Sequence, residues 1–147
     1  MNNYKTIAET EKDIIEDFAL FDTWEEKYEY IIDLGKKLPP LADEHKIEEN
    51  IIKGCQSTVW LVADYRDHQV FYQADSDAMI VKGLISMLIQ VLSGHSPDEI
   101  IEAKLDFIRE IGMTTHLAQT RANGLLAMVK QIKNYALAFK SIKTIEA

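Results

Sequence analysis

The first forty residues alternate apolar and polar positions with the period of an α-helix. Thr6 is followed by Glu9 and Thr23 by Glu26, and both pairs have the spacing of a capping box at a helix start. An apolar stripe follows each pair: Ile7, Ile14, Phe18 and Phe21 after the first, and Trp24, Tyr28, Ile31 and Leu38 after the second. Pro39-Pro40 ends the second stripe, because proline has no N–H group to donate. The pattern predicts two amphipathic helices.

Between residues 51 and 73 the pattern becomes typical of β-strands. After a polar segment over 41–50, which we expect to be a loop, Ile51-Ile52 is a short strand candidate. Residues 58–65 and 70–73 are rich in β-branched and aromatic side chains, and the four residues between them indicate a hairpin connection. We expect a small three-stranded antiparallel sheet.

Helical periodicity returns after Asp75-Ser76-Asp77, a run that we expect to cap a helix extending to about Ser93. Gly94 is the expected stop signal of this helix. The helix is apolar nearly all round, which is typical of a helix buried at the centre of a domain.

A further helix start is predicted at Ser96-Pro97-Asp98-Glu99, which combines an N-cap serine, a first-turn proline and a capping-box glutamate. Another apolar segment over 107–111 is closed by Gly112. The last helix begins near Ala118, and its apolar stripe consists of Leu125, Met128, Ile132, Tyr135, Phe139 and Ile142. Two helices, about three strands and several more helices predict a single α+β domain over residues 1–147, with helices packed on the small sheet.

Composition and charge exclude several classes of function. The chain has 147 residues and a formal net charge of -8, which disfavours binding to nucleic acid or to an anionic membrane surface. A basic protein partner is electrostatically favoured, although many acidic proteins are simply soluble. The most apolar stretch, over 78–92, is interrupted by Lys82, Gly83 and Gln90 and is too short to span a bilayer. We expect no nucleic-acid or membrane partner.

The chain contains a single cysteine, Cys55, which excludes an internal disulfide and a CxxC pair. A lone cysteine fits a reducing compartment, and the first residues are acidic and lack the apolar run of a secretory signal. We therefore expect a cytoplasmic protein. Any thiol chemistry is done by Cys55 alone or together with a partner protein.

The neighbours of Cys55 favour a reactive thiol over an inert core residue. Gly54 precedes it and Gln56-Ser57 follows, and these residues are poor core neighbours at a junction between strands. Lys53 is close enough in sequence to favour the thiolate, which is the nucleophilic form, whereas the acidic net charge opposes ionisation. A lone cysteine is nevertheless also a common core residue.

Arg121 and Gly124 lie near the start of the last predicted helix. Arg121 is either an ordinary surface residue or a cation that stabilises a thiolate or persulfide. A glycine inside a helix costs about 1 kcal/mol relative to alanine, so Gly124 calls for a structural reason. The four histidines lack the spacing of metal ligands, so we expect no metal site. The glycine-rich phosphate-binding motifs and the GxSxG motif are also absent.

Five runs of residues, in order along the chain, resemble the SufE family of sulfur-acceptor proteins. They are Trp24-Glu25-Glu26-Lys27-Tyr28; Ile31-Ile32-Asp33-Leu34-Gly35 with Leu38-Pro39; Gly54-Cys55-Gln56-Ser57 with Val59-Trp60; Asp75-Ser76-Asp77 with Ile80-Val81-Lys82-Gly83-Leu84; and His116-Leu117 with Arg121 and Gly124-Leu125. The resemblance covers roughly Thr23 to Ile132, most of the chain, and the run around Cys55 is the most specific of the five. The resemblance implies the SufE/IscU-like fold, with helices on a three-stranded antiparallel sheet.

The resemblance also implies a function. Cys55 is expected to take sulfur as a persulfide from a cysteine desulfurase, SufS-like or CsdA-like, to stimulate that enzyme, and to pass the sulfur to a SufBCD-type scaffold for iron–sulfur cluster assembly. Pyridoxal phosphate belongs to the desulfurase, so this chain is expected to bind no cofactor and to act as a carrier without turnover of its own. The residues match SufE and its paralogue CsdE alike.

Several further residues acquire roles through the resemblance. Arg121 and His116 match residues near the cysteine surface and are expected to support Cys55. Gly54, Gln56 and Ser57 flank the cysteine, and these residues and Asp75 are expected to face the partner. In the family the resting cysteine is tucked against apolar side chains, and its loop moves out on docking.

Two other functions remain open for a lone cysteine on a loop. A redox-sensing thiol protein would be oxidised at Cys55 to a sulfenic acid and would not respond to a desulfurase. A purely non-covalent adaptor would activate a desulfurase by binding, with or without the thiol.

Overall fold

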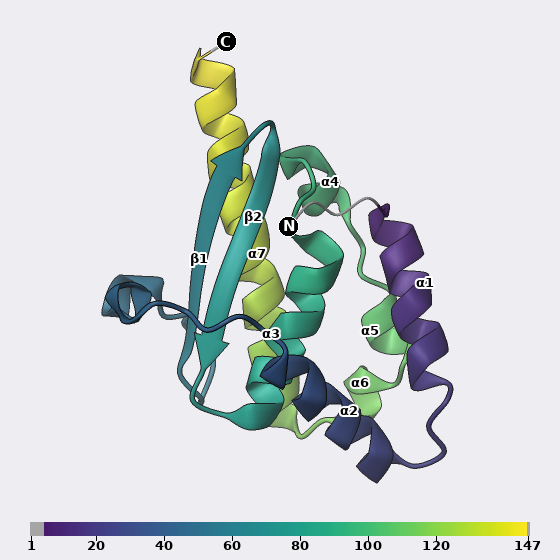
Figure 1. The fold of residues 1–147 in the computed structure, drawn as a ribbon. Helices are drawn as coiled ribbons and strands as arrows, with labels where there is room; N and C mark the ends of the chain where they lie inside the picture. Colours follow the sequence, from purple (N-terminus) through teal and green to yellow (C-terminus); the bar gives the residue numbers. More distant parts are fainter. Residues whose placement is uncertain (1–4, 147) are drawn as a thin grey trace.

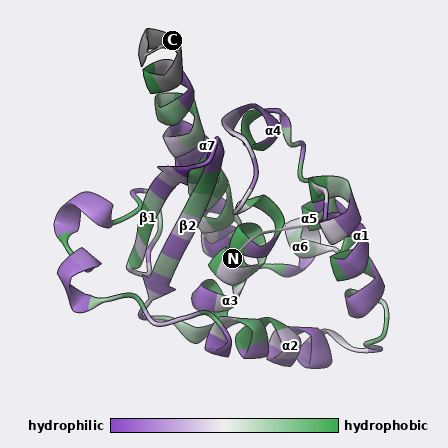
Figure 2. Ribbon diagram, turned by 45° about the horizontal axis from the view of Figure 1, so that its top comes forward, coloured by the Kyte–Doolittle hydropathy of each residue, from purple (hydrophilic) through white to green (hydrophobic). Residues whose placement is uncertain are grey.

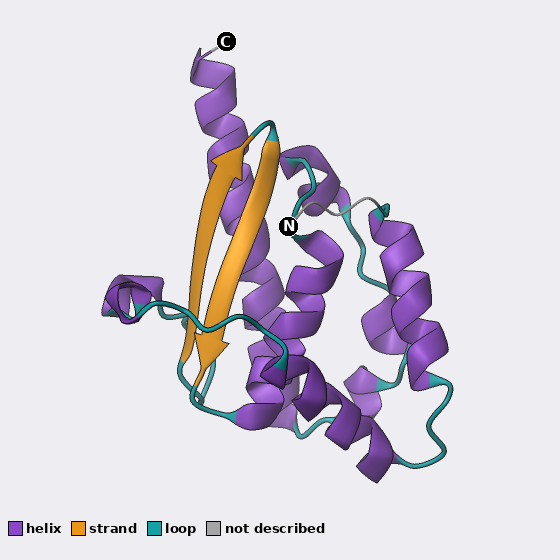
Figure 3. Cartoon of the chain, viewed as in Figure 1, coloured by secondary structure: helices purple, strands orange, loops and turns teal. Residues whose placement is uncertain are grey.

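A β-hairpin with helices packed against one face forms the centre of the molecule (Figures 1 and 3). The computed structural model describes residues 5–146. The helices are α1 Ile7–Phe18, α2 Trp24–Lys36, α3 Met79–Leu92, α4 Pro97–Glu102, α5 Phe107–Glu110, α6 Met113–His116 and α7 Gln119–Glu146; the strands are β1 Val59–Arg66 and β2 Gln69–Ser76; and two single-turn 3-10 helices are η1 Asp43–His45 and η2 Glu48–Asn50. The predicted α+β class is confirmed.

The predicted hairpin is confirmed. β1 and β2 pair antiparallel from Val59↔Ser76 to Arg66↔Gln69. Asp67 and His68 form the two-residue turn, with φ values of 52° and 65°, and this left-handed backbone matches the twist of the flanking strands. Alternate residues of both strands are buried on the face that meets the helices: Val59, Leu61, Val70, Tyr72 and Ala74.

The prediction of a third strand was wrong, because the sheet among the described residues has two strands. Ile51 forms only an isolated bridge to Trp60, and the Ile52 N–H donates to Val59 O at 2.8 Å. Gly54 then turns the chain away with φ +96°. Two residues before such a turn are too few to extend a ladder along β1.

The buried central helix is α3, as its apolar sequence predicts. Eight of its residues are buried: Val81, Gly83, Leu84, Ile85, Met87, Leu88, Val91 and Leu92. The predicted cap at Asp75-Ser76-Asp77 was wrong, because the N-cap is Ala78 and makes no side-chain hydrogen bond. Asp75 and Ser76 instead end β2, and Asp77 Oδ1 accepts the Thr58 N–H at 3.1 Å. Gly94, with φ +86°, follows the end of α3 as expected.

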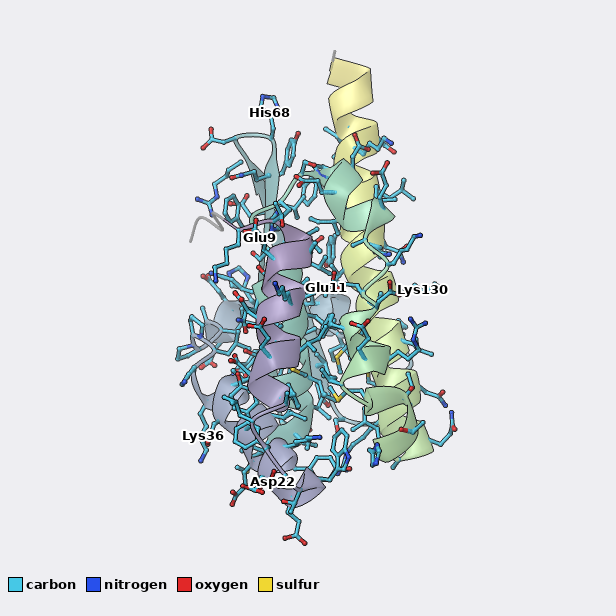
Figure 4. The ribbon with its side chains drawn as sticks, turned by 90° about the vertical axis from the view of Figure 1, so that its right-hand side faces the viewer. Glu9, Glu11, Asp22, Lys36, His68 and Lys130 are labelled. Atoms are coloured by element: carbon cyan, nitrogen blue, oxygen red, sulfur yellow. The ribbon has the colours of Figure 1, made fainter. Side chains whose placement is uncertain are left out.

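The capping boxes at Thr6, Thr23 and Ser96 are all formed. In Figure 2, α1 and α2 alternate hydrophilic and hydrophobic positions, as expected for helices with one face on the core. α1 also meets α5, where the Glu11 carboxylate accepts the Phe107 N–H at 3.3 Å, and burial raises the pKa of Glu11 (Figure 4).

α7 runs along the hairpin and projects beyond its tip (Figure 1). Leu125, Met128 and Ile132 of its predicted stripe are buried. The expectation that Ile142 belongs to the core was wrong, because this residue lies on the projecting end and is 46% exposed. Tyr72 of β2 donates its hydroxyl to Ile132 O at 2.7 Å and ties the middle of α7 to the hairpin.

α2 and α3 approach so closely that their backbones are in contact. A Cβ on Gly83 would lie 2.0 Å from Ile31 O, and a Cβ on Gly35 would lie 2.7 Å from Gly83 N. Glycines at these two positions therefore set the distance between the helices. The Ser86 hydroxyl donates to Leu34 O at 3.0 Å and adds a polar contact across the same interface.

Replacing Gly83 by alanine should destabilise the fold. The added Cβ meets backbone atoms that cannot rotate away, so Gly83→Ala is expected to lower the free energy of unfolding by about 2–4 kcal/mol. Urea denaturation followed by circular dichroism measures the effect. Gly124→Ala is the matched control, because its Cβ would lie 3.6 Å from the nearest atom and alanine is the better helix former. Equal stability of the two variants would contradict the account.

Candidate functional site at Cys55

Cys55 lies on the turn between the Ile51 bridge and β1, where the chain packs against α7. Its thiol is half-buried, and Sγ donates a hydrogen bond to Gly124 O of α7 at 3.5 Å. This carbonyl lies in the second turn of the helix. The cysteine is thus on a loop, as predicted, and its thiol points at a helix backbone.

A pocket of about 260 Å³ opens beside the thiol. Val81 of α3 and Met128 of α7 supply apolar surface. Polar groups come from Gln56, Ser57, Thr120 and Arg121. The volume of the pocket is much larger than that of one sulfur atom.

A glycine allows the cysteine turn to lie against α7. Gly54 has φ +96°, a backbone conformation that side chains other than glycine rarely adopt, and a Cβ there would lie 3.3 Å from Ala127 Cβ. Gly124 of α7 lies beneath the thiol, where a Cβ would be 3.6 Å from Cys55 Sγ, in ordinary van der Waals contact. The space beside the sulfur therefore does not require a glycine at position 124.

Burial raises the pKa of the Cys55 thiol above its ordinary value. The expectation that nearby Lys53 favours the thiolate is therefore not met in this conformation, since the shift has the opposite direction. The protonated thiol fits its hydrogen bond to Gly124 O, because only S–H can donate there. The resting thiol is held in its less nucleophilic form.

The structure brings Arg121, Gln56 and Ser57 together with Cys55 around the pocket. Arg121 is exposed, so its guanidinium lies at the solvent side of the site. His116 lies elsewhere: its ring stacks on Trp24 of α2, with centroids 4.1 Å apart. Any support that His116 gives to Cys55 is therefore indirect in this conformation.

Comparison with known proteins places this arrangement in a family. The family described as "SufE: Fe-S metabolism associated domain" matches residues 12–136, which include Cys55, Arg121 and the whole pocket. The chain belongs to the SufE family. An uncharacterized SufE-like protein of Rhizobium meliloti is 43% identical over 129 residues, covering 84% of this chain and 91% of that protein. One of Synechocystis is 42% identical over 127 residues, covering 86% and 80%.

The fold of this SufE domain has a solved counterpart. The solution structure of a hypothetical protein from Thermus thermophilus superposes with a TM-score of 0.72, covering 88% of this chain and 94% of that one. The sequence identity is 22%, so the likeness concerns the fold alone. It supports helices on an antiparallel hairpin as the architecture that carries the cysteine turn.

Asp75 of the SufE domain, expected to face a partner, is turned to two lysines in this conformation. Its carboxylate pairs with Lys46 at 3.3 Å and Lys82 at 3.2 Å, and only 11% of the side chain is exposed. Burial disfavours the ionised form of Asp75. The Ser76 N–H, which donates to Asp75 Oδ1 at 2.8 Å, and the two lysine ammonium groups outweigh this effect, so the pKa of Asp75 is lowered. Lys46 also lies 5.5 Å from the Trp60 ring centroid. The cluster ties the 41–50 segment to β2 and α3.

Some site residues carried no signal in the sequence. Thr120 and Met128 line the pocket, but neither stands in a motif that marks a thiol site. Val81 appeared as an apolar position of a predicted helix and within a run that resembles the SufE family, but its place beside Cys55 depends on how α3 packs. Pairing of Lys46 with Asp75 joins residues 29 positions apart, which periodicity does not reveal.

The described part of the chain offers no other obvious chemistry. Residues 5–146 contain no group of three or more potential metal ligands. Within the same range, none of the helices is both long and apolar enough to cross a bilayer.

Removing the Asp75 charge should weaken the fold in a pH-dependent way. The folded pKa is lowered, so the stabilisation is present above the unfolded pKa of about 3.9 and is lost as pH falls through the folded value. Asp75→Asn is expected to cost about 1–3 kcal/mol at neutral pH, and the difference from wild type should shrink in acid. Urea titrations across pH measure this. Asp22→Asn is the control, because that side chain is exposed and lies outside the lysine cluster around Asp75. A pH-independent difference would contradict the ion-pair account.

The resting thiol should react slowly with alkylating reagents. Because burial raises the pKa of Cys55, its reaction with iodoacetamide is expected to reach half its maximal rate at a higher pH than the same reaction of an unstructured cysteine peptide. Intact mass measured over time at several pH values gives both profiles. A midpoint at or below that of the peptide would contradict the half-buried position of the thiol against α7.

Proposed function

We propose that Cys55 accepts sulfur as a persulfide from a pyridoxal-phosphate cysteine desulfurase and relays it to an iron–sulfur scaffold of the SufBCD type. Membership of the SufE family supports a sulfur-transfer role in iron–sulfur metabolism. The observation that carries the finer assignment is the single cysteine, half-buried beside a pocket that has room for additional sulfur. With no second cysteine in the chain, the sulfur enters and leaves through one atom.

The transfer step balances without an oxidant. The thiolate of Cys55 attacks the outer sulfur of the persulfide on the desulfurase, and a bond forms between the two sulfur atoms. The S–S bond on the desulfurase breaks, and its cysteine leaves as a thiolate. The outer sulfur arrives with its proton, so Cys55 then carries Cys55–S–SH, which becomes Cys55–S–S⁻ on losing that proton. The same exchange with an acceptor thiolate returns Cys55 to its starting state.

The resting conformation explains why transfer would need docking. The thiol is protonated, bonded to Gly124 O and half-buried, so it is a poor nucleophile. Movement of the cysteine turn away from α7 breaks that bond and exposes the sulfur, which removes the cause of the raised pKa. Gly54 gives the turn the backbone freedom that such a movement requires. Docking and activation of the thiol would thus be one event.

Arg121 is placed to act on the loaded state. Persulfides are more acidic than thiols, so the outer sulfur of a loaded Cys55 is an anion at neutral pH, and a guanidinium at the same pocket stabilises it electrostatically. Ser57 and Thr120 line the same pocket and offer hydroxyl donors. The apolar side chains of Val81 and Met128 limit access of water and of stray reductants.

Intact mass spectrometry separates this function from its alternatives. The chain is incubated with a SufS-like desulfurase, pyridoxal phosphate and cysteine, and an added mass of about 32 Da at Cys55 is expected, which corresponds to one sulfur atom. Cys55→Ser should still bind the desulfurase but neither gain sulfur nor raise its rate of sulfide release.

Two outcomes would contradict the proposal. Activation that persists in Cys55→Ser would assign the chain to non-covalent adaptors. Oxygen added to Cys55 by peroxide, with no sulfur added despite demonstrated binding of the desulfurase, would favour a redox-sensing thiol.

A further inference from the structure

The aromatic cluster around His116 lies outside the Cys55 pocket, but it is fastened to the segment that leads into one of the pocket walls. The His116 ring stacks on Trp24 with an interplanar angle of 15°. The hydroxyl of Tyr28, one turn further along α2, donates to the main-chain oxygen of His116. Both the side chain and the main chain of His116 are therefore held by α2.

Gly112 completes this contact from the other side. Its φ is +87°, and a Cβ there would lie 2.9 Å from Trp24 Cζ2 and 3.3 Å from His116 Nδ1. Gly112 O lies 3.1 Å from His116 Nδ1 and can only accept, so this ring nitrogen is the donor. That bond keeps the imidazole in the plane in which it stacks on Trp24. The turn from Gly112 to His116 thus closes around the indole.

The wall of the pocket begins two residues after His116. Ala118, Thr120 and Arg121 line the pocket, and the Ala122 N–H donates to Ala118 O at 3.0 Å as the helix starts. The bond from Tyr72 to Ile132 O holds α7 to the hairpin further along the helix. The start of α7 is instead held to α2, through the turn that carries His116.

The side of the pocket that α3 forms also depends on α2. Val81 belongs to α3, and α3 is in backbone contact with α2 at Gly35 and Gly83. α2 therefore holds the α3 side of the pocket through the two glycines, and it holds the α7 side through the Trp24–His116 stack. Figure 1 shows α2 beside both α6 and the lower part of α3.

We propose that Trp24, Tyr28 and His116 form a positioning clamp that holds the start of α7 and so sets the opening of the Cys55 pocket. His116 acts through the turn and does not touch the thiol. The clamp deepens the proposed function and rests on it, since the pocket matters as the place where sulfur is received. Loss of the clamp lets residues 118–121 move away from Cys55, which exposes the sulfur.

Alkylation of the full-length chain in the absence of any desulfurase tests the clamp. His116→Ala is expected to raise the rate of Cys55 alkylation by iodoacetamide by about threefold to tenfold, because removing the stack makes local opening more frequent. The pH midpoint of alkylation should also move down, because burial is what raises the thiol pKa.

A conservative variant distinguishes positioning from a general loss of stability. His116→Phe keeps an aromatic ring on Trp24 and is expected to alkylate within about twofold of wild type. Tyr28→Phe removes only the hydroxyl that bonds to His116 O, keeps the packing, and should raise the rate by about twofold to fivefold. It serves as the test if His116→Ala does not fold.

His45→Ala is the matched control, because the His45 side chain on η1 is 43% exposed and does not line the pocket, so this variant should leave the rate unchanged. An unchanged rate and midpoint in both His116→Ala and Tyr28→Phe would overturn the clamp. Failure of His116→Phe to restore the wild-type rate would likewise overturn it, because the stack would not be the interaction that matters. Sulfur loading by a desulfurase is a separate measurement, so either proposal can fail while the other stands.

Discussion

α2 and α3 touch through their backbones at Gly35 and Gly83, and the geometry of the thiol site depends on that contact. α3 supplies Val81 to one side of the Cys55 pocket, and its position follows from how close α2 can come. α2 also presents Trp24 and Tyr28 to His116, ahead of the first residues of α7 that line the pocket. A helix that contributes no side chain to the pocket lining thus holds both of its sides. Small residues at the point where two helices cross set the distance between the helix axes. That distance then fixes the relative positions of the side chains on the two helices.

If Cys55 carries sulfur as proposed, its resting state reconciles two requirements that conflict in such a carrier. A nucleophile needs a thiolate, whereas a persulfide needs protection from reductants. Burial beside α7 meets the second requirement, and in the unloaded state the hydrogen bond to Gly124 O and the raised pKa of Cys55 keep the thiol protonated. The turn at Gly54 supplies the freedom to satisfy the first. Selectivity would then come from docking, because only a partner that draws the turn outward generates the reactive form.

The local elements of this fold were predictable because their causes are local. The three capping boxes and the hairpin each depend on residues within a few positions of one another. The third strand and the cap at Asp75 were predicted wrongly because tertiary contacts determine both. The chain turns at Gly54 to pack against α7, so Ile51 forms only an isolated bridge, and the Asp75 carboxylate pairs with two lysines. The position of Cys55 on a loop was visible in its neighbours. Its burial, its bond to Gly124 and the place of His116 on Trp24 depend on helix packing that no spacing encodes.

The central claim is tested most directly by following sulfur that the desulfurase has already removed from free cysteine. A SufS-like desulfurase is loaded with radioactive sulfur on its own cysteine, freed of substrate, and mixed with the chain. The account predicts that the label leaves the desulfurase and appears on Cys55, with a limit of one sulfur per chain because the chain has one cysteine. Label that stays on the desulfurase, or that is released only as free sulfide while Cys55 remains unlabelled, would contradict it.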